Sequence, residues 1–179
     1  MTGYTFPVVG FCAFSGTGKT TLLKQLIPLL ADRGIRLGVI KHAHHNFDID
    51  KPGKDSYELR KAGARQLLVA SGRRWALMTE TQDDGDPRLD TLIGRLDPEG
   101  IDLVLVEGFK HVPFPRIELH RPSLGHSLLH PEDSNIIAVA TDEPVQTGDL
   151  PRLDLNNAAA IAEFILAWLE EQNDDARKE

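Results

Sequence analysis

The stretch AFSGTGKTT, from Ala13 to Thr21, decides the fold that this sequence predicts. It matches the phosphate-binding loop motif G-x-x-x-x-G-K-[ST], except that Ala13 stands where the motif has its first glycine. An apolar run rich in strand-forming residues, Phe6 to Phe14, leads into it. In the segment that follows, leucine and isoleucine recur at helical spacing as far as Gly34. Strand, loop and helix in this order are the context that a phosphate-binding loop requires.

In such a loop, backbone N–H groups surround an anion at the start of a helix, a lysine contacts the outer phosphates and a hydroxyl binds Mg²⁺. Glycines let the backbone approach the phosphates closely, and a methyl group at Ala13 is tolerated if that residue has a negative φ. We therefore expect the loop to bind a nucleotide, with Thr20 as a magnesium ligand. The predicted nucleotide-binding residues are Ser15, Gly16, Thr17, Gly18, Lys19, Thr20 and Thr21.

Length and composition predict a single nucleotide-binding domain over residues 1–179, with a frayed tail over 170–179. Hydrophobic residues make up 41% and charged residues 26%, which is ordinary for a globular protein. The formal net charge of -7 argues against a general nucleic-acid binder. Neither a leader peptide nor an apolar run of about 18 residues is visible, so we expect a cytoplasmic protein without a membrane span. The single cysteine, Cys12, fits a reducing compartment.

Strand-like runs alternate with helical segments along the chain, which indicates an α/β fold with a mostly parallel central sheet. The run IDLVLVEGF, residues 101–109, is the most apolar and is expected at the centre of the sheet. The runs at 66–71 and 74–80 form either a hairpin or two consecutive strands around Gly72. We predict a three-layer, P-loop NTPase-like fold, to which that hairpin would be an extension.

Acidic residues at strand ends are candidates for the metal and for catalysis. Glu107 ends the most apolar strand, where a carboxylate could hold Mg²⁺ or its water. Asp48 and Asp50 follow another strand and so belong to the same edge of a parallel sheet, where either could position a metal-bound water. We predict Glu107 and Asp50 as catalytic residues. Asp142 ends a further strand and could accept hydrogen bonds from a guanine, although the N-K-x-D sequence of many GTPases is absent.

More specific than the loop is the pattern KHAHHNFDIDKPGKDSYELRKAGA, residues 41–64. Together with AFSGTGKTTLLKQLIP, RWALMTE, LVLVEGFKH and IAVATDEP, in this order, it resembles the molybdopterin-guanine dinucleotide biosynthesis protein B (MobB) family. The resemblance implies a homodimer that binds GTP and Mg²⁺ and hydrolyses GTP slowly at most. It also implies an adaptor that acts with a MobA-like molybdopterin guanylyltransferase, with molybdopterin and with proteins that insert the metal. No functional residue is carried over onto residues 121–134.

Two other functions stay open from the residues. One is a small-molecule kinase that uses the same loop, with Asp50 or Glu107 as its general base. The other is a GTP-dependent metal-handling chaperone, in which the loop of His42, His44 and His45 would bind the metal, although no cysteine or tetrahedral ligand spacing supports it. No arginine is obviously placed to stabilise phosphoryl transfer, so hydrolysis should be slow. The arginines that another subunit or the fold could bring close are Arg60, Arg65, Arg73 and Arg74.

Overall fold

The computed structural model describes residues 6–43, 47–81 and 85–178. The chain divides into two compact units, which are described separately. The first, Met1–His42 with Arg88–Glu179, is called the sheet unit, and the second, Ala43–Pro87, is called the hairpin unit. The single domain predicted over residues 1–179 stays a prediction.

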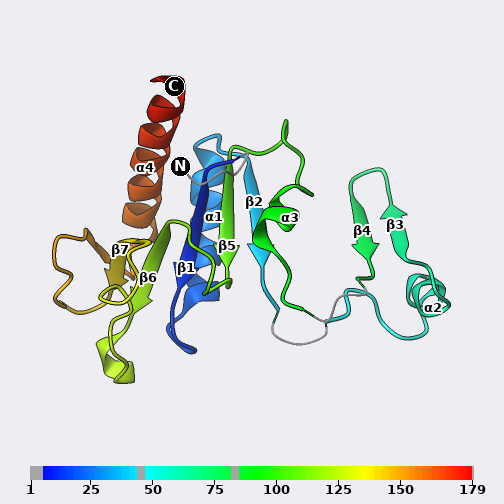
Figure 1. Ribbon diagram of the computed structural model, residues 1–179, viewed down its shortest axis with the longest axis horizontal. Helices are drawn as coiled ribbons and strands as arrows, with labels where there is room; N and C mark the ends of the chain where they lie inside the picture. The colour runs from blue at the N-terminus through cyan, green and yellow to red at the C-terminus, as the bar shows by residue number, and fades with distance from the viewer. Residues whose placement is uncertain (1–5, 44–46, 82–84, 179) are drawn as a thin grey trace. The chain divides into compact units, whose positions relative to one another are not determined.

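The sheet unit is built on a six-stranded sheet with the strand order β2-β5-β1-β6-β7-β8, in which every pairing is parallel (Figure 1). The mostly parallel α/β sheet predicted from the sequence is confirmed. Only β8 was not expected, because three residues at the edge of a sheet are too few to show a strand pattern. The strands are β1 (Val8–Cys12), β2 (Leu37–Lys41), β5 (Leu103–Glu107), β6 (Arg116–His120), β7 (Ile136–Thr141) and β8 (Arg152–Asp154).

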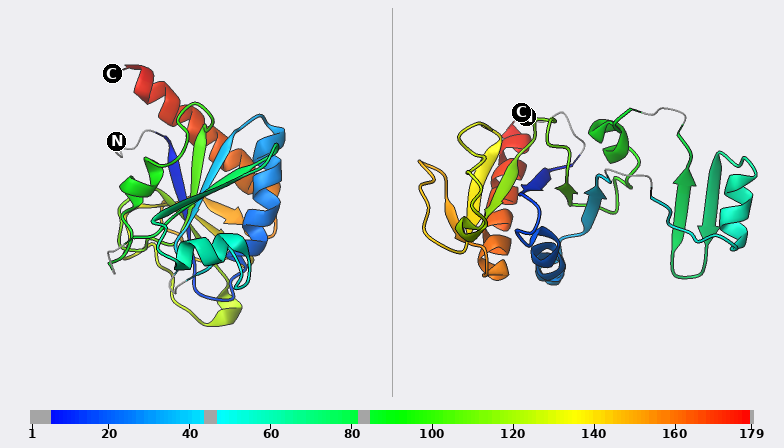
Figure 2. Two further views of the ribbon diagram at one scale, coloured as in Figure 1. Left: turned by 90° about the vertical axis from the view of Figure 1, so that its right-hand side faces the viewer. Right: turned by 90° about the horizontal axis from the view of Figure 1, so that it is seen from below.

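Helices cover both faces of this sheet and make the predicted three layers (Figure 2). On one face, α1 (Lys19–Asp32) and α4 (Ala158–Lys178) pack on alternate strand residues such as Val9 and Leu105. On the other face, α3 (Leu89–Ile93) packs on Val104 and Val106. The strand β5 lies between β2 and β1, and its residues 103–106 are fully buried. It is therefore an inner strand as expected, but it stands second from one edge of the sheet and not at its centre.

The two long helices of the sheet unit are continuous. The helix α1 is assigned without interruption through Pro28. The helix α4 continues to Lys178, and fraying of the end of the chain over 170–179 stays a prediction. The segment after Glu170 contains neither glycine nor proline, and solvent exposure by itself does not end a helix. Within the described residues, no helix is long and apolar enough to cross a membrane.

The hairpin unit contains α2 (Asp55–Lys61) followed by β3 (Gln66–Ala70) and β4 (Trp75–Thr79). The two strands pair antiparallel, with Gln66 opposite Thr79 and Ala70 opposite Trp75. Of the two arrangements that the sequence allowed here, the hairpin is therefore the one that forms.

Arg60 of α2 joins three segments of the hairpin unit. Its guanidinium donates to Asp48 at 2.5 Å, to Asp50 at 2.7 Å and to Glu80 at 2.7 Å. The side chains of Arg60 and Asp50 are only 9% and 8% exposed. These hydrogen bonds raise the pKa of Arg60 and lower the pKa of Asp50. The small hairpin unit has few other buried side chains, so this ion-pair network ties its helix to its hairpin.

We predict that Arg60→Met destabilises the hairpin unit at pH 7, because it leaves Asp50 buried without its counter-ion. The pKa of Asp50 is lower in the folded protein than its ordinary value, so the stabilisation from this pair is present above that ordinary value and is lost as the pH falls through the folded one. The difference in the stability of the hairpin unit between wild type and variant should therefore become smaller below about pH 4. Hydrogen exchange of the β3 and β4 amides measures it.

The exposed Arg73 at the hairpin turn offers a matched control, because Arg73→Met removes the same charge from the same unit without touching the network. Equal exchange rates in Arg60→Met and Arg73→Met at pH 7 would contradict the stabilising role of the network.

Candidate functional site

The loop between β1 and α1 has the backbone that phosphate binding requires. Gly16 and Gly18 have φ angles of 83° and 100°, which side-chain-bearing residues rarely adopt. Ala13 does not share this region, since Phe109 is the one non-glycine residue with positive φ in the described part of the chain. The side chain of Thr17 is buried, and its hydroxyl donates to the carbonyl of Phe14 at 2.9 Å. The loop is thus closed on itself and tolerates Ala13.

The helix α1 begins directly after this loop. Its cap is Gly18, so no side chain caps the first turn. The first-turn N–H groups of Lys19, Thr20 and Thr21 therefore carry the partial positive charge that helix N-termini offer to anions. Thr20 and Thr21 are exposed, as is Ser15 at the start of the loop.

Glu107 and Lys19 are brought together, because β5 lies next to β1 with Glu107 opposite Phe11. The distance from Lys19 Nζ to Glu107 Oε1 is 3.9 Å. A second lysine, Lys41 at the end of β2, donates to Glu107 Oε2 at 3.1 Å. The carboxylate is 17% exposed and lies between two ammonium groups. One edge of the sheet therefore combines the loop, two cations and one anion.

The turn after Glu107 has an unusual backbone. Gly108 and Phe109 both have positive φ, at 104° and 55°. A Cβ on Gly108 would lie 2.5 Å from Cβ of His42, so only glycine fits there. The ring of His42 stacks on Phe109 with a centroid distance of 4.8 Å, and its backbone N–H donates to the carbonyl of Glu107 at 2.8 Å. His42 thus packs against the turn that follows the candidate metal ligand.

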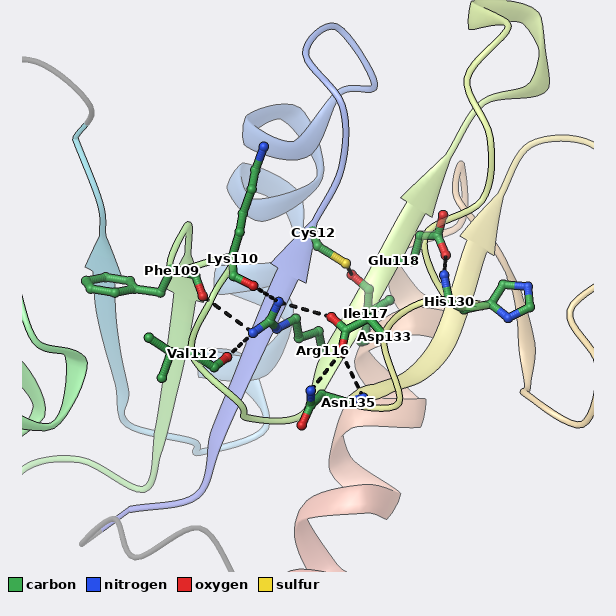
Figure 3. Close-up of polar contacts among 10 residues, drawn as sticks. All are labelled: Cys12, Phe109, Lys110, Val112, Arg116, Ile117, Glu118, His130, Asp133 and Asn135. Carbon is green, nitrogen blue, oxygen red and sulfur yellow. Dashed lines mark hydrogen bonds and ion pairs between the residues drawn. The ribbon is translucent and has the colours of Figure 1, made fainter. Parts of the chain in front are cut away.

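Arg116, at the start of β6, holds this turn through hydrogen bonds to its backbone (Figure 3). Its side chain is almost fully buried and donates to the backbone carbonyls of Phe109, Lys110 and Val112. Its charge is paired with Asp133 at 3.1 Å. A buried guanidinium can serve several acceptors at once because its five N–H groups form a rigid planar fork. Arg116 therefore fixes the backbone immediately after Glu107 and Gly108.

Glu118, two residues further along β6, orders the segment after this strand. Glu118 is 1% exposed, and its carboxylate accepts the N–H group of Leu129 at 2.7 Å. It also accepts the N–H group of His130 at 2.9 Å (Figure 3). Cys12 of β1 lies opposite Glu118, and its thiol donates to the carbonyl of Ile117. Burial raises the pKa of the Cys12 thiol to about 12, so it stays protonated and has little nucleophilic character at neutral pH.

Arg121 is a site residue that the sequence prediction missed. It follows β6, and its Nε donates to the backbone carbonyl of Thr17, within the phosphate loop, at 2.9 Å. The guanidinium also forms an ion pair with Asp142 at 2.5 Å and donates to Asn156 at 3.4 Å. A signal was present in the sequence, since a polar residue directly after a buried strand belongs to the same edge of a parallel sheet as the loop.

Asp142 follows β7, where we expected a contact with the base. Its Oδ2 is engaged by Arg121, while Oδ1 is buried and has no hydrogen-bond partner among the described residues. Arg121 and Asn156 contribute to a cleft of about 240 Å³ that begins at the loop. The sequence and the structure thus agree that polar side chains gather at this edge.

The remaining candidates belong to the hairpin unit or lie outside the described residues. Asp50, a predicted catalytic residue, is held by Arg60 within the hairpin unit, so its distance from the loop is not defined and its role stays a prediction. His44 and His45 lie outside the described residues. Among those that are described, no group of three or more His, Cys, Asp or Glu side chains is arranged to hold a metal ion.

Comparison with known proteins supports the resemblance read from the sequence. A model of the family "Molybdopterin guanine dinucleotide synthesis protein B" (MobB) matches residues 8–142. A molybdopterin-guanine dinucleotide biosynthesis adapter protein of Escherichia coli (strain K12) is 53% identical over 178 residues, which cover 97% of this chain and 99% of the relative. The relative from Haemophilus influenzae, with the same name, is 48% identical and covers 91% of this chain and 89% of its own.

Solved structures agree with the sequence comparison. A crystal structure of molybdopterin-guanine biosynthesis protein B superposes with a TM-score of 0.71 at 28% identity, covering 91% of this chain and 99% of the other. A crystal structure of Bacillus subtilis MobB gives 0.72 at 26% identity, with 90% and 97% covered. Both the sequence and the fold, with its phosphate loop and Glu107 at one sheet edge, therefore show that this chain belongs to the MobB family of molybdopterin-guanine dinucleotide biosynthesis adapter proteins.

Proposed function

We propose that this protein is a cytoplasmic GTP-binding adaptor, which acts with a guanylyltransferase when GMP is attached to molybdopterin. The proposal rests on three features that lie at one edge of the sheet. They are the glycine-rich loop, the helix N-terminus without a side-chain cap, and the Lys19–Glu107 pair. This arrangement suits a nucleoside triphosphate with its Mg²⁺ ion. The adapter role comes from the names of the relatives in Escherichia coli and Haemophilus influenzae.

In this proposal, the amides of residues 15–21 and the ammonium of Lys19 hold the β- and γ-phosphates of GTP. Thr20 and Glu107 would hold Mg²⁺, which would offset the negative charge of the phosphates. The donors fit that role, since Mg²⁺ prefers oxygen ligands and Glu107 has a partly exposed carboxylate next to the loop. Lys19 would then exchange its pairing with Glu107 for the phosphates.

Slow hydrolysis is part of the same proposal. An arginine that stabilises phosphoryl transfer must be free to reach the γ-phosphate. Arg60 is engaged by Asp48, Asp50 and Glu80, and Arg121 is engaged by Asp142 and the carbonyl of Thr17. We propose Glu107 as the carboxylate that acts on the attacking water, in a protein that is a slow GTPase at most. Asp50 is paired with Arg60 in the hairpin unit, and its catalytic role stays a prediction.

Replacing the loop lysine tests the nucleotide site. Lys19→Ala should weaken Mg²⁺·GTP binding at least about tenfold, because it removes a charge-assisted contact to the outer phosphates. Isothermal titration calorimetry measures the affinity. Lys24→Ala is a matched control, since Lys24 is an exposed lysine of the same helix, one turn further on. If Lys19→Ala and Lys24→Ala bind GTP with the affinity of the wild type, the loop is not the nucleotide site.

We also propose that the partner is a MobA-like molybdopterin guanylyltransferase, with molybdopterin itself and metal-insertion proteins as further partners. Purified guanylyltransferase immobilised on resin should retain this protein, and we expect the amount retained to change at least about twofold when Mg²⁺·GTP is added. The physical reason is linkage, since a nucleotide that binds the free and the complexed adaptor with different affinity must shift their equilibrium. Lys19→Ala should show no response to GTP. No retention with or without GTP would contradict the partnership.

A homodimer is the third part of the proposal. The hairpin unit exposes Leu68, Val69, Trp75 and Leu77, which are between 47% and 68% accessible in the single chain. Large apolar side chains gathered on one exposed hairpin are typical of surfaces that another chain covers.

We expect Trp75→Glu combined with Leu77→Glu to shift the protein from dimer to monomer, because each carboxylate would lose hydration on association. Light scattering after size-exclusion chromatography gives the mass. The double variant Arg73→Glu and Arg74→Glu places two carboxylates at the exposed turn of the same hairpin, with a larger change of net charge, and should remain dimeric. A wild-type protein that is monomeric at all concentrations would refute the dimer, and a dimeric Trp75 and Leu77 variant would place the interface elsewhere.

A further inference from the structure

The cleft that begins at the phosphate loop extends beyond the proposed phosphate contacts, to residues that take no part in them. One wall comes from the loop and the start of α1, with Gly18, Thr21 and Leu22. The other comes from the segments after β6 and β8, with Arg121, Leu155 and Asn156. Its volume of about 240 Å³ is somewhat below the roughly 300–1,000 Å³ of sites that enclose a whole small-molecule ligand. The cleft therefore suits one part of a ligand whose remainder lies on the loop.

Arg121 is the charged residue in this cleft. Its guanidinium lies beside the loop, since a Cβ on Gly18 would be 3.8 Å from the Arg121 Nη2 atom. Each of its three nitrogens makes one hydrogen bond, to Thr17, Asp142 and Asn156. A guanidinium has five N–H groups, so donors remain for a ligand in the cleft. It has no acceptor, and so it distinguishes ligand atoms that accept hydrogen bonds from those that donate them.

Two further polar groups stand next to Arg121. Asn156 carries a side-chain amide, which can both donate and accept. Asp142 has its Oδ1 buried without a hydrogen-bond partner among the described residues, which is costly unless a ligand supplies a donor. Cationic donors, an amide and a carboxylate acceptor thus come together from the ends of three adjacent strands, β6, β7 and β8.

We propose that the nucleoside of the bound nucleotide lies in this cleft, and that Arg121 selects guanine over adenine. Guanine presents two neighbouring acceptors, O6 and N7, to which an arginine can donate from both sides of its fork. Adenine has an amino group in place of O6, and this donor would face the donors of Arg121. Leu22 and Leu155 supply apolar contact for the base, while Asn156 bonds to the base edge or the ribose. The inference rests on the proposed function, because the phosphates on the loop bring the nucleoside to the cleft.

Titration with three ligands tests this inference: GTP, ATP and inorganic tripolyphosphate, each with Mg²⁺. Tripolyphosphate reports on the loop alone. GTP and ATP share their phosphates, so any disturbance of the loop cancels in the ratio of their affinities. For the wild type we expect GTP to bind more tightly than ATP. In Arg121→Gln that preference should fall at least about tenfold, because glutamine offers both a donor and an acceptor to the purine.

Two more variants complete the design. Asn156→Ala should weaken GTP binding about fivefold or more and leave tripolyphosphate binding unchanged, since it removes one hydrogen bond without touching the loop. Arg152→Gln changes an exposed arginine of β8 outside the cleft and should leave every affinity unchanged. Thermal unfolding shows whether each variant is folded.

The outcomes separate this inference from the proposed function. If the wild type binds neither GTP nor tripolyphosphate, or if Lys19→Ala binds both normally, the phosphate site itself is refuted. If GTP binds through Lys19 but the wild type does not prefer it over ATP, or a folded Arg121→Gln keeps the preference, the role of Arg121 is overturned and the phosphate site stands. Should Arg121→Gln fail to fold, unchanged GTP binding by Asn156→Ala overturns the cleft assignment.

Discussion

The site depends on two charged side chains that are buried within one strand. Arg116 and Glu118 are 4% and 1% exposed, on the same side of β6. Arg116 holds the backbone carbonyls of the turn after β5, and Glu118 holds two amides in the segment that follows β6. The first segment carries Gly108 beside Glu107, and the second begins with Arg121. The two segments that flank the phosphate loop are therefore positioned by buried charges of β6.

Burying such charges has a cost, which the structure offsets with hydrogen bonds. Removing one member of a buried ion pair typically destabilises a protein by about 3 to 5 kcal/mol, because the other member keeps its desolvation penalty. Arg116 is compensated by three carbonyls, by Asp133 and by the ring of Phe114, 4.6 Å from its guanidinium carbon. An apolar strand would cost less free energy to bury. It could not, however, hold the backbone carbonyls and amides of two irregular segments in a defined geometry.

The sequence predicted those features whose signal lies in residues close together along the chain. The strand, loop and helix around Gly16 and Gly18 carry their signal within some twenty residues, and the run ending at Glu107 carries its own in apolar composition. The sequence did not predict the place of Arg121 at the loop, because its contact with Thr17 spans 104 positions and starts from an irregular segment.

In β6, RIELH alternates polar and apolar residues as a half-exposed strand does, yet all five are buried. The pattern cannot show that loops cover the polar face. Asp50 was predicted at the nucleotide from its position after a strand. It belongs to the hairpin unit, where it has its own ion pairs, and its role at the nucleotide stays a prediction.

Lys19 and Lys41, which share Glu107, give the loop edge a local charge opposite to that of the whole molecule. The chain carries a formal net charge of -7, while these three side chains sum to one positive charge. An approaching polyanion is therefore repelled at long range and attracted only within about one Debye length, roughly 8 Å at physiological ionic strength. Salt weakens both effects, and the long-range repulsion is screened first. Capture of a polyanion by this protein is thus a short-range event, governed by the last few ångströms of its approach.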